Sequence, residues 1–225
     1  MRRFLLVALS LLLSAAALAQ QQQPQLTWVR FYQGGDVTPA AKAKLDPLLA
    51  SKKIAGWGVL EPMSHLGEEW SQALFVTVQD WSVLDDIDLP DGARVHDVVL
   101  RHVIQSQGPG AKVPRFLVTN YHPITRGRDT DAHALFNEWA KPVFDKLTAA
   151  GKIGPWGLSV QTIVIDNKWT YMVWYFMPDL SALDDVHTEL MAMGMSRLMT
   201  YERRLREMSE DDYIGQVLRV VHWGT

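Results

Sequence analysis

Short apolar runs alternate with longer amphipathic stretches along the chain, and the same order occurs twice. Leu26–Tyr32 and Arg115–Tyr121 are rich in β-branched and aromatic residues, which predicts a β-strand at the start of each half. After the second of these strands, apolar residues recur every four positions from Leu135 to Leu147, the spacing of one face of an α-helix. Each half is therefore expected to run strand, helix, strand, strand, helix, strand.

Capping and turn residues predict where the other elements begin. The first helix is expected to begin at Thr38-Pro39 in one half and at Thr130 or Asp131 in the other. Pro47 and Pro142 lie inside these helices and predict a kink or a fresh start. The remaining strands are expected over residues 57–60, 70–78, 98–105, 156–165, 169–176 and 216–223.

A second helix in each half is expected to begin at Ser82 and at Ser181. An acidic pair follows each serine, Asp85-Asp86 and Asp184-Asp185, at the positive end of the expected helix dipole. Adjacent helix positions point about 100° apart, so neither pair is well placed to hold one substrate. Helix capping is the preferred interpretation of both pairs.

The two halves also correspond residue by residue. Residues 44–87 align with residues 143–186 at a constant offset of 99 without a gap, and 13 of the 44 positions are identical. The matches include Trp57-Gly58 with Trp156-Gly157 and an Asp-x-Ser-x-Leu-Asp-Asp string in each half. This correspondence indicates an internal duplication.

The predicted order of elements indicates an α+β fold. A βαββαβ unit is the ferredoxin-like arrangement, a four-stranded antiparallel sheet with both helices on one face. Residues 169–176 are largely apolar on both alternating faces, so the face away from the helices also needs a cover. We therefore predict two tandem ferredoxin-like units, residues 26–106 and 115–225, joined by a linker over residues 107–114. Their antiparallel sheets are expected to pack face to face as a pseudo-dimeric α+β barrel around a ligand cavity.

The first 25 residues predict export. Met1-Arg2-Arg3, an apolar run and Ala17-Leu18-Ala19 form the pattern of a cleavable signal peptide over residues 1–19, with an uncleaved membrane anchor as the alternative. Residues 20–25 are mostly glutamine and are interpreted as a polar leader. We therefore expect a periplasmic or secreted protein with no membrane segment after cleavage.

Composition narrows the partner classes. Of the 225 residues 48% are hydrophobic and 21% are charged, which is enough apolar material for a full core. The chain has no cysteine, so its stability must come from apolar burial rather than disulfides. The net charge is −3, whereas a nucleic-acid binder needs a basic stripe to neutralise phosphates. No nucleic-acid partner is therefore expected.

Three strings in the second half carry a family resemblance. They are a helix from Trp139 to Leu147, Gly-Lys-Ile-x-x-Trp-Gly at Gly151–Gly157 and Asp-Leu-Ser-x-Leu at Asp179–Leu183. With the duplication, they resemble the dimeric α+β-barrel superfamily, and more narrowly secreted bacterial members with two fused units. The first half departs from the pattern at Lys52, where the second half has Gly151. The superfamily includes cofactor-free monooxygenases and haem-dependent chlorite dismutase-like proteins, so the resemblance implies a fold more than an activity.

Ionisable side chains within apolar strands are the candidate ligand-binding residues, because such groups must find a partner or point into a wet pocket. If they point inward, arginine would hold an anionic or carbonyl-bearing molecule, with tyrosine or histidine as proton donor or acceptor. The competing interpretation is that they face outward and pair with Asp or Glu. No catalytic residue is assigned. The candidates are Arg30, Arg101, His102, Tyr121, His122, Tyr171, Tyr175 and Arg219.

No cofactor or metal is predicted, because none of the seven histidines has the spacing of a metal site. Ligand types suited to copper or haem iron recur every four residues at His187, Met191, Met195 and Met199. Methionines at helical spacing more often fill a core or an interface, which is the preferred interpretation. The resemblance to chlorite dismutase-like proteins implies an axial histidine on the first helix of the second half, where the only histidine is His133.

Three functions are compatible with these observations. The first is binding of a small molecule in or near the cavity between the sheets, because no catalytic motif is recognised. The second is a cofactor-free monooxygenase or isomerase that acts on an aromatic substrate. The third is a subunit-interaction protein that forms a homodimer through edge strands and the methionine-rich helix. A closed cavity with convergent Arg, His or Tyr side chains would favour the second, and self-association would favour the third.

Overall fold

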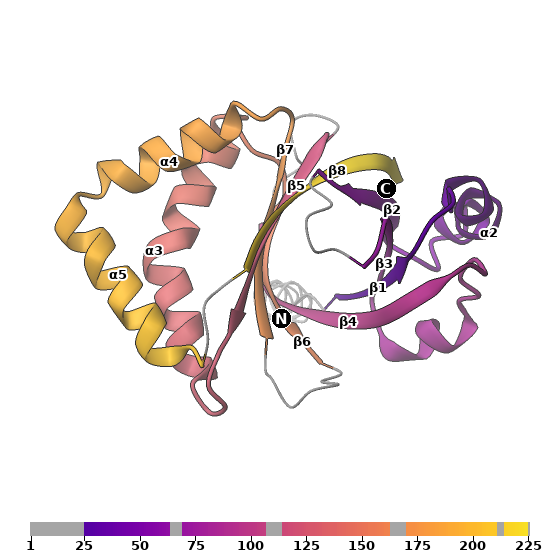
Figure 1. The fold of residues 1–225 in the computed structure, drawn as a ribbon, viewed down its shortest axis with the longest axis horizontal. Helices are drawn as coiled ribbons and strands as arrows, with labels where there is room; N and C mark the ends of the chain where they lie inside the picture. The colour runs from indigo at the N-terminus through magenta and orange to yellow at the C-terminus, as the bar shows by residue number, and fades with distance from the viewer. Residues whose placement is uncertain (1–24, 64–68, 107–113, 163–169, 211–213, 225) are drawn as a thin grey trace, which may run out of the picture.

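The computed structural model describes residues 25–63, 69–106, 114–162, 170–210 and 214–224. Eight antiparallel strands form a closed barrel in the order β1-β3-β2-β8-β5-β7-β6-β4 (Figure 1). The α+β class and the barrel are therefore confirmed. The strands are β1 (Leu26–Tyr32), β2 (Gly56–Pro62), β3 (Gln72–Val78), β4 (Arg94–Gln105), β5 (Phe116–Pro123), β6 (Trp156–Gln161), β7 (Thr170–Met177) and β8 (Ile214–Gly224).

The two groups of four strands join edge to edge. The first four have the order β4-β1-β3-β2 and the last four the order β8-β5-β7-β6. Pairing of β2 with β8 and of β4 with β6 closes the barrel. The prediction was that the two sheets pack face to face. They are also joined through their edges, so every edge strand has a hydrogen-bonding partner.

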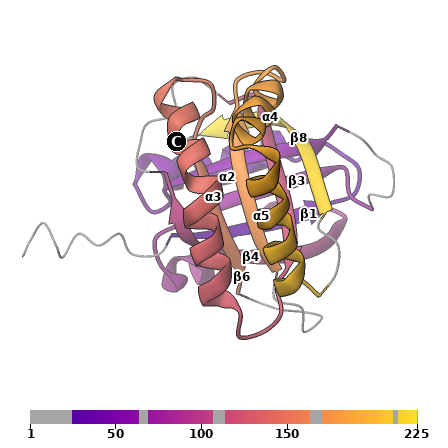
Figure 2. The same ribbon diagram turned by 90° about the vertical axis from the view of Figure 1, so that its left-hand side faces the viewer.

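Helices cover the barrel on two opposite sides (Figure 1). Helix α2 (Thr38–Ala50) lies outside the first half, whereas α3 (Asp129–Ala149), α4 (Ala182–Ala192) and α5 (Met195–Met208) lie outside the second. Figure 2 shows α3 and α5 side by side across the strands, where they pack against each other. Helix α2 continues past Pro47 and α3 past Pro142, so the fresh start predicted at these prolines is absent.

The second helix of each half differs from the prediction. In the first half it is a 3₁₀ helix of six residues, Trp81–Asp86, and in the second half it is split into α4 and α5. The split falls at Gly194, whose φ of +88° is a conformation that glycine adopts without strain. The first half therefore lacks one of the two α-helices of a ferredoxin-like unit.

The break at Gly194 changes the position of the methionines. Met191, Met195 and Met199 are 40%, 59% and 60% exposed, so of the two predicted alternatives they do not pack in the core, and packing in an interface stays a prediction. One face of a continuous helix would have carried all three, but α4 and α5 are separate helices. These methionines lie on the outer surface of the helical layer.

Asp184 and Asp185 lie in the first turn of α4, at the positive end of its dipole as predicted, whereas Asp85 and Asp86 end the 3₁₀ helix. The side chain that bonds to the backbone at each turn is a different aspartate. The side chain of Asp80 accepts a hydrogen bond from the backbone nitrogen of Ser82 at 2.9 Å, and Asp179 accepts one from that of Ser181 at 3.0 Å. The shared Asp-x-Ser string thus forms the same turn in both halves. Of the second acidic pair, Asp185 forms an ion pair with Lys152.

Several predictions fall on residues outside the described ranges. They are the signal peptide over residues 1–19, most of the leader over 20–25 and nearly all of the linker over 107–114. Within the described ranges, the helices are too short or too polar to span a bilayer.

Candidate ligand-binding cavity inside the barrel

Alternation along the strands decides which side chains face the barrel interior. In β1, Thr27, Val29 and Phe31 line the interior, and the residues between them face outward. The same alternation places Trp57 and Trp156 outward, where they are 0% and 1% exposed beneath the outer layers, and turns the glycine after each inward. A strand glycine often marks a close approach by another group.

The two inward glycines make room for two aromatic rings. A Cβ on Gly58 would lie 2.6 Å from the Phe75 ring, and one on Gly157 would lie 2.6 Å from the Trp174 ring. Each ring belongs to the residue paired with that glycine on the neighbouring strand. Phe75 and Trp174 are themselves 99 residues apart. The Trp-Gly repeat therefore places one aromatic side chain from each half inside the barrel.

The barrel encloses a cavity of about 410 Å³, within the usual range for small-molecule sites. None of the described residues that line it is Asp, Glu, Lys or Arg. The Trp223 ring lies between two others, 5.6 Å from Phe75 and 4.6 Å from Phe176. The wall is therefore uncharged and mainly apolar, with hydroxyl, amide and imidazole groups among the lining. Its aromatic residues are Phe31, Phe75, Tyr121, Trp174, Phe176 and Trp223.

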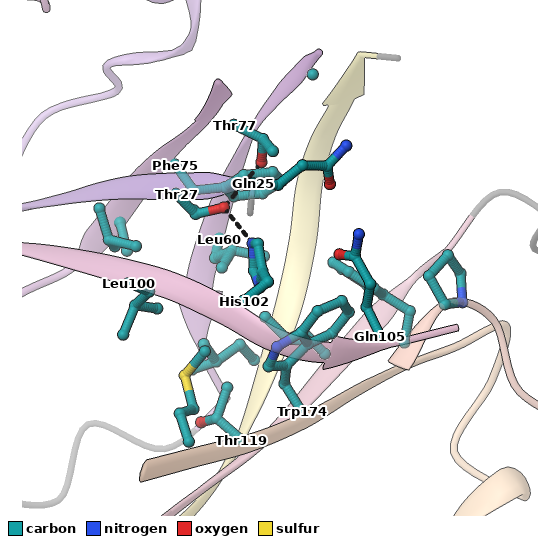
Figure 3. Close-up of a pocket in the computed structure, with 18 of the residues that line it drawn as sticks. Gln25, Thr27, Leu60, Phe75, Thr77, Leu100, His102, Gln105, Thr119 and Trp174 are labelled. Atoms are coloured by element: carbon teal, nitrogen blue, oxygen red, sulfur yellow. Dashed lines mark hydrogen bonds between the residues drawn. The ribbon is translucent and has the colours of Figure 1, made fainter. Parts of the chain in front are cut away.

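A chain of hydrogen bonds crosses the interior from β3 to β7. At its centre, the His102 imidazole lies 2.8 Å from Thr27 Oγ1 through Nε2 and 2.7 Å from Ser159 Oγ through Nδ1. Figure 3 shows Thr27, Thr77 and His102 converging from three strands. At one end, Thr27 Oγ1 lies 2.9 Å from Thr77 Oγ1. At the other, Trp174 Nε1 donates to Ser159 Oγ at 2.8 Å.

Burial keeps the imidazole of His102 uncharged. Removal from water disfavours the cation and lowers the pKa of His102 to about 4. The rings of His102 and Trp174 are T-shaped to each other, with 5.4 Å between their centroids. At neutral pH the cavity therefore contains a neutral group with one N–H donor and one acceptor nitrogen.

A second cavity of about 170 Å³ lies towards the other end of the barrel. It shares Val29, Phe31, Leu100, Tyr121 and Gln216 with the first cavity, so the two are neighbours. His96 lines it and stacks on Phe31 with a centroid distance of 4.2 Å.

Two of the eight predicted ligand-binding residues, His102 and Tyr121, line the main cavity. The other six alternate with lining residues and face outward. Arg30 forms a bidentate pair with Asp97 at 2.9 and 3.0 Å, Arg219 pairs with Glu61, and Arg101 is exposed. No arginine is therefore found among the described lining residues of the cavity.

The remaining three candidates lie beneath the helices of the second half. Tyr171 donates a hydrogen bond to Asp129 at 2.6 Å, and burial together with this bond raises the pKa of Tyr171. Burial raises the pKa of Tyr175 to about 12 and lowers the pKa of His122 to about 4. Tyr171 and Tyr175 pack in the core between the strands and the second-half helices.

Sequence reasoning missed the polar side chains linked to His102. Thr27 and Ser159 contact its two ring nitrogens, and Thr77 and Trp174 bond to these two hydroxyl groups in turn. Comparing the two halves at the offset of 99 could have found two of them, because Ser159 corresponds to Leu60 and Trp174 to Phe75. Where both residues of an apolar pair in one half have polar groups in the other half, the barrel interior is expected to be polar on that side only.

Within the described residues, the donor groups predicted for haem or copper do not come together in one site. Both nitrogens of His102 are engaged by hydroxyl groups, so neither is free to bind a metal in this arrangement. His133 lies outside the main cavity lining, with its ring 5.5 Å from that of Tyr171. Met191 and Met195 lie on separate helices. The described residues contain no cluster of three or more His, Asp or Glu side chains suited to a metal ion.

Comparison with known proteins shows the fold. No protein-family model and no curated protein sequence matches the chain. A candidate monooxygenase from Fusobacterium nucleatum aligns with a TM-score of 0.62 at 10% identity, over 92% of this chain and 96% of that one. A candidate monooxygenase from Lactobacillus acidophilus aligns with a TM-score of 0.57 at 12% identity, over 90% and 96% of the two chains. Chlorite dismutase from Candidatus Nitrospira defluvii aligns with a TM-score of 0.54 at 9% identity, over 93% and 95%. The chain therefore has the fold of the dimeric α+β barrels.

Proposed function

We propose that the protein binds an uncharged, largely aromatic small molecule inside the barrel, beside His102. The observation that carries this proposal is the cavity of about 410 Å³ with aromatic walls and no charged residue among its described lining. An ion buried there would lose its hydration without gaining a counter-charge, which is strongly unfavourable. A flat apolar molecule would gain burial and ring contacts instead.

A few polar groups inside the cavity supply orientation. Thr119 is 2% exposed, and its hydroxyl has no hydrogen-bond partner in the described part of the chain. An unsatisfied buried hydroxyl costs about 1–3 kcal/mol, so a ligand with a polar substituent would relieve that cost. The cavity thus combines an apolar body with few polar contacts, the usual composition of a small-molecule site.

Titration with fluorene tests the proposal, with quenching of tryptophan fluorescence as the readout. Ala73 lines the cavity and is 1% exposed, so Ala73→Leu narrows the space and should weaken fluorene binding at least tenfold. Val221 is 41% exposed, and Val221→Leu serves as the control that enlarges an apolar side chain outside the cavity to the same leucine. Failure of fluorene to bind, or equal weakening by both variants, would refute the proposal.

Turnover of the bound molecule is a second candidate function, favoured by the neutral imidazole beside the cavity. A cofactor-free oxygenase would convert anthrone and dioxygen to anthraquinone and water, with a base removing the first proton. The pKa of His102, about 4, makes it a weak base, so binding without turnover is the better supported function. Anthraquinone formation above the rate in buffer, lost in His102→Gln, would establish turnover.

Self-association is proposed from the exposed apolar surface on the second half. Leu180, Met191, Met195 and Met199 are each at least 40% exposed. Exposed apolar side chains that are contiguous on a surface are typical of protein–protein contacts. A homodimer formed here should dissociate on Met195→Glu in size measurements over a range of protein concentrations. A monomer at every concentration would exclude it.

Export and a duplicated origin are proposed from the sequence. The signal-like pattern before Gln20 and the gapless offset of 99 support them, and the shared strand order of the two halves agrees with duplication. The intact mass of protein recovered from the cell envelope tests export, because cleavage should leave a chain that begins at Gln20.

A further inference from the structure

The hydrogen-bond chain through His102 has a direction, because one end is a pure donor. The indole Nε1–H of Trp174 can only donate, so Ser159 Oγ accepts at 2.8 Å. Ser159 is 0% exposed, and among the described residues its other hydrogen-bond partner is His102 Nδ1 at 2.7 Å. The Ser159 hydrogen must therefore be donated to Nδ1, since a buried hydroxyl hydrogen without an acceptor is costly.

The direction then continues through the imidazole. Burial keeps His102 neutral, so with Nδ1 as the acceptor the ring hydrogen is on Nε2. Nε2–H donates to Thr27 Oγ1 at 2.8 Å, and the Thr27 hydroxyl in turn donates to Thr77 Oγ1 at 2.9 Å. Every hydrogen in the chain now has an acceptor except that of Thr77. Thr77 lines the cavity, and Figure 3 shows it beside Thr27.

We propose that the Thr77 hydroxyl is the terminal donor of this chain and binds a carbonyl oxygen on the aromatic ligand, so that the ligands are aryl ketones or quinones. This inference rests on the proposed function, because it names the polar group of the molecule held in the cavity. Each hydroxyl that accepts a hydrogen bond becomes a better donor, so the chain strengthens the donor at its end. The reverse direction would leave Ser159 with two donors and a hydrogen without an acceptor.

Paired probes separate this inference from the proposed function. Fluorene and 9-fluorenone have the same ring system, and only the ketone has an acceptor oxygen. Wild-type protein should bind 9-fluorenone about three- to tenfold more tightly than fluorene, the effect of one added hydrogen bond. Thr77→Val should abolish this preference, measured as the ratio of the two affinities within the same variant, whereas Thr77→Ser should keep it. Unfolding midpoints of both variants control for folding.

The outcomes are distinct. If fluorene itself does not bind, the proposed function fails. If fluorene binds and 9-fluorenone binds no more tightly, or if Thr77→Val keeps the ketone preference, the inference is overturned while the proposed function stands.

The direction of the hydrogen bonds through His102 can be tested separately by ¹⁵N NMR of its imidazole. The His102 signals are assigned by their loss in His102→Gln, and they should report a hydrogen on Nε2 and a bare Nδ1 near neutral pH. Ser159→Ala should shift the Nδ1 signal more than the Nε2 signal. A hydrogen on Nδ1 in the wild-type protein would overturn the inference.

Discussion

The first and second halves of the barrel use one scaffold for two different interiors. In both, a buried tryptophan faces outward, the next glycine faces inward, and an aromatic ring from the neighbouring strand lies over that glycine. In the first half the ring is Phe75, and the residue 99 before Ser159 is Leu60, so this pair is apolar. In the second half Trp174 and Ser159 share a hydrogen bond. The hydrogen bond between these two positions is therefore present in the second half only.

The outer surfaces of the halves differ as well. The first half is covered by α2 and a 3₁₀ helix of six residues, and the second by α3, α4 and α5. The larger cover buries Tyr171, Tyr175 and Val186 in one extended core. The two halves share the barrel geometry. They differ in the side chains that face the barrel interior and in the helices that cover the outside.

The largest expected effect is acid destabilisation by two buried imidazoles, His102 at the seam between the halves and His122 in the second half only. Burial lowers the pKa of each to about 4, below the unfolded value of 6.5. Between these values the unfolded chain binds more protons, so stability falls as the pH drops from 6.5 through 4, by about 3 kcal/mol for each imidazole. Urea unfolding at pH 7.5, 5.5 and 4 measures the loss.

Single variants separate the two imidazoles. His102→Gln and His122→Gln should each remove roughly half of the extra acid sensitivity, and carboxylate protonation should affect all three proteins alike. A wild-type pH profile that neither substitution changes would show that both imidazoles have the same pKa in the folded protein as in the unfolded chain.

The next prediction tests whether Gly58 and Gly157 have the same role, which is to leave room for an aromatic ring in their half of the barrel. Gly58→Ala and Gly157→Ala should each destabilise the protein by about 3 kcal/mol, because the added Cβ meets a ring and a backbone oxygen within 2.8 Å. Gly215→Ala is the matched control, because its Cβ would meet only the side-chain end of Asn120. Thermal unfolding measures all three. Losses no larger than that of the control would contradict the role given to these glycines.

A smaller effect is expected from making the second half resemble the first. Ser159→Ala removes the partner of both Trp174 Nε1 and His102 Nδ1, which should destabilise the protein by about 2 kcal/mol. In the Ser159→Ala background the indole N–H of Trp174 has lost its acceptor. Adding Trp174→Phe removes this unsatisfied donor and should raise the free energy of unfolding by about 1 kcal/mol. Strict additivity of the two losses in urea unfolding would show that the hydrogen bond contributes nothing.

The strands could be predicted from the sequence because strand residues alternate with a period of two. The repeat also allows each strand to be identified independently in both halves. All eight strands overlap their predicted ranges, and β1 matches residue for residue. The second helices were predicted less well, because the sequence signal is an Asp-x-Ser turn that both halves share. The helix after that turn is six residues of 3₁₀ helix in one half and α4 in the other, and its form depends on packing against the barrel.

The cavity side chains were harder to predict because β7 is apolar on both faces. Alternation pairs Tyr171 with Tyr175 and Met172 with Trp174, but hydrophobicity alone does not say which pair faces inward. The same ambiguity made the adjacent residues Arg101 and His102 both candidates for ligand binding. Adjacent strand residues point to opposite faces, so only one of them can line the cavity. Gly157 resolves it, since a strand glycine opposite Trp174 marks the face where a ring needs room.

The smallest expected effect compares the equivalent tryptophans. Trp57 donates a hydrogen bond from Nε1 to Asp46 at 3.1 Å, whereas the buried Nε1 of Trp156 has no partner among the described residues. Trp57→Phe therefore loses a hydrogen bond and Trp156→Phe removes an unsatisfied donor, so the first should be more destabilising by about 1 kcal/mol. Lys141 lies 5.5 Å from the Trp156 ring, but phenylalanine keeps an aromatic face for it. Urea unfolding of both variants measures the difference, and equal losses would mean that volume alone determines the effect of removing either indole.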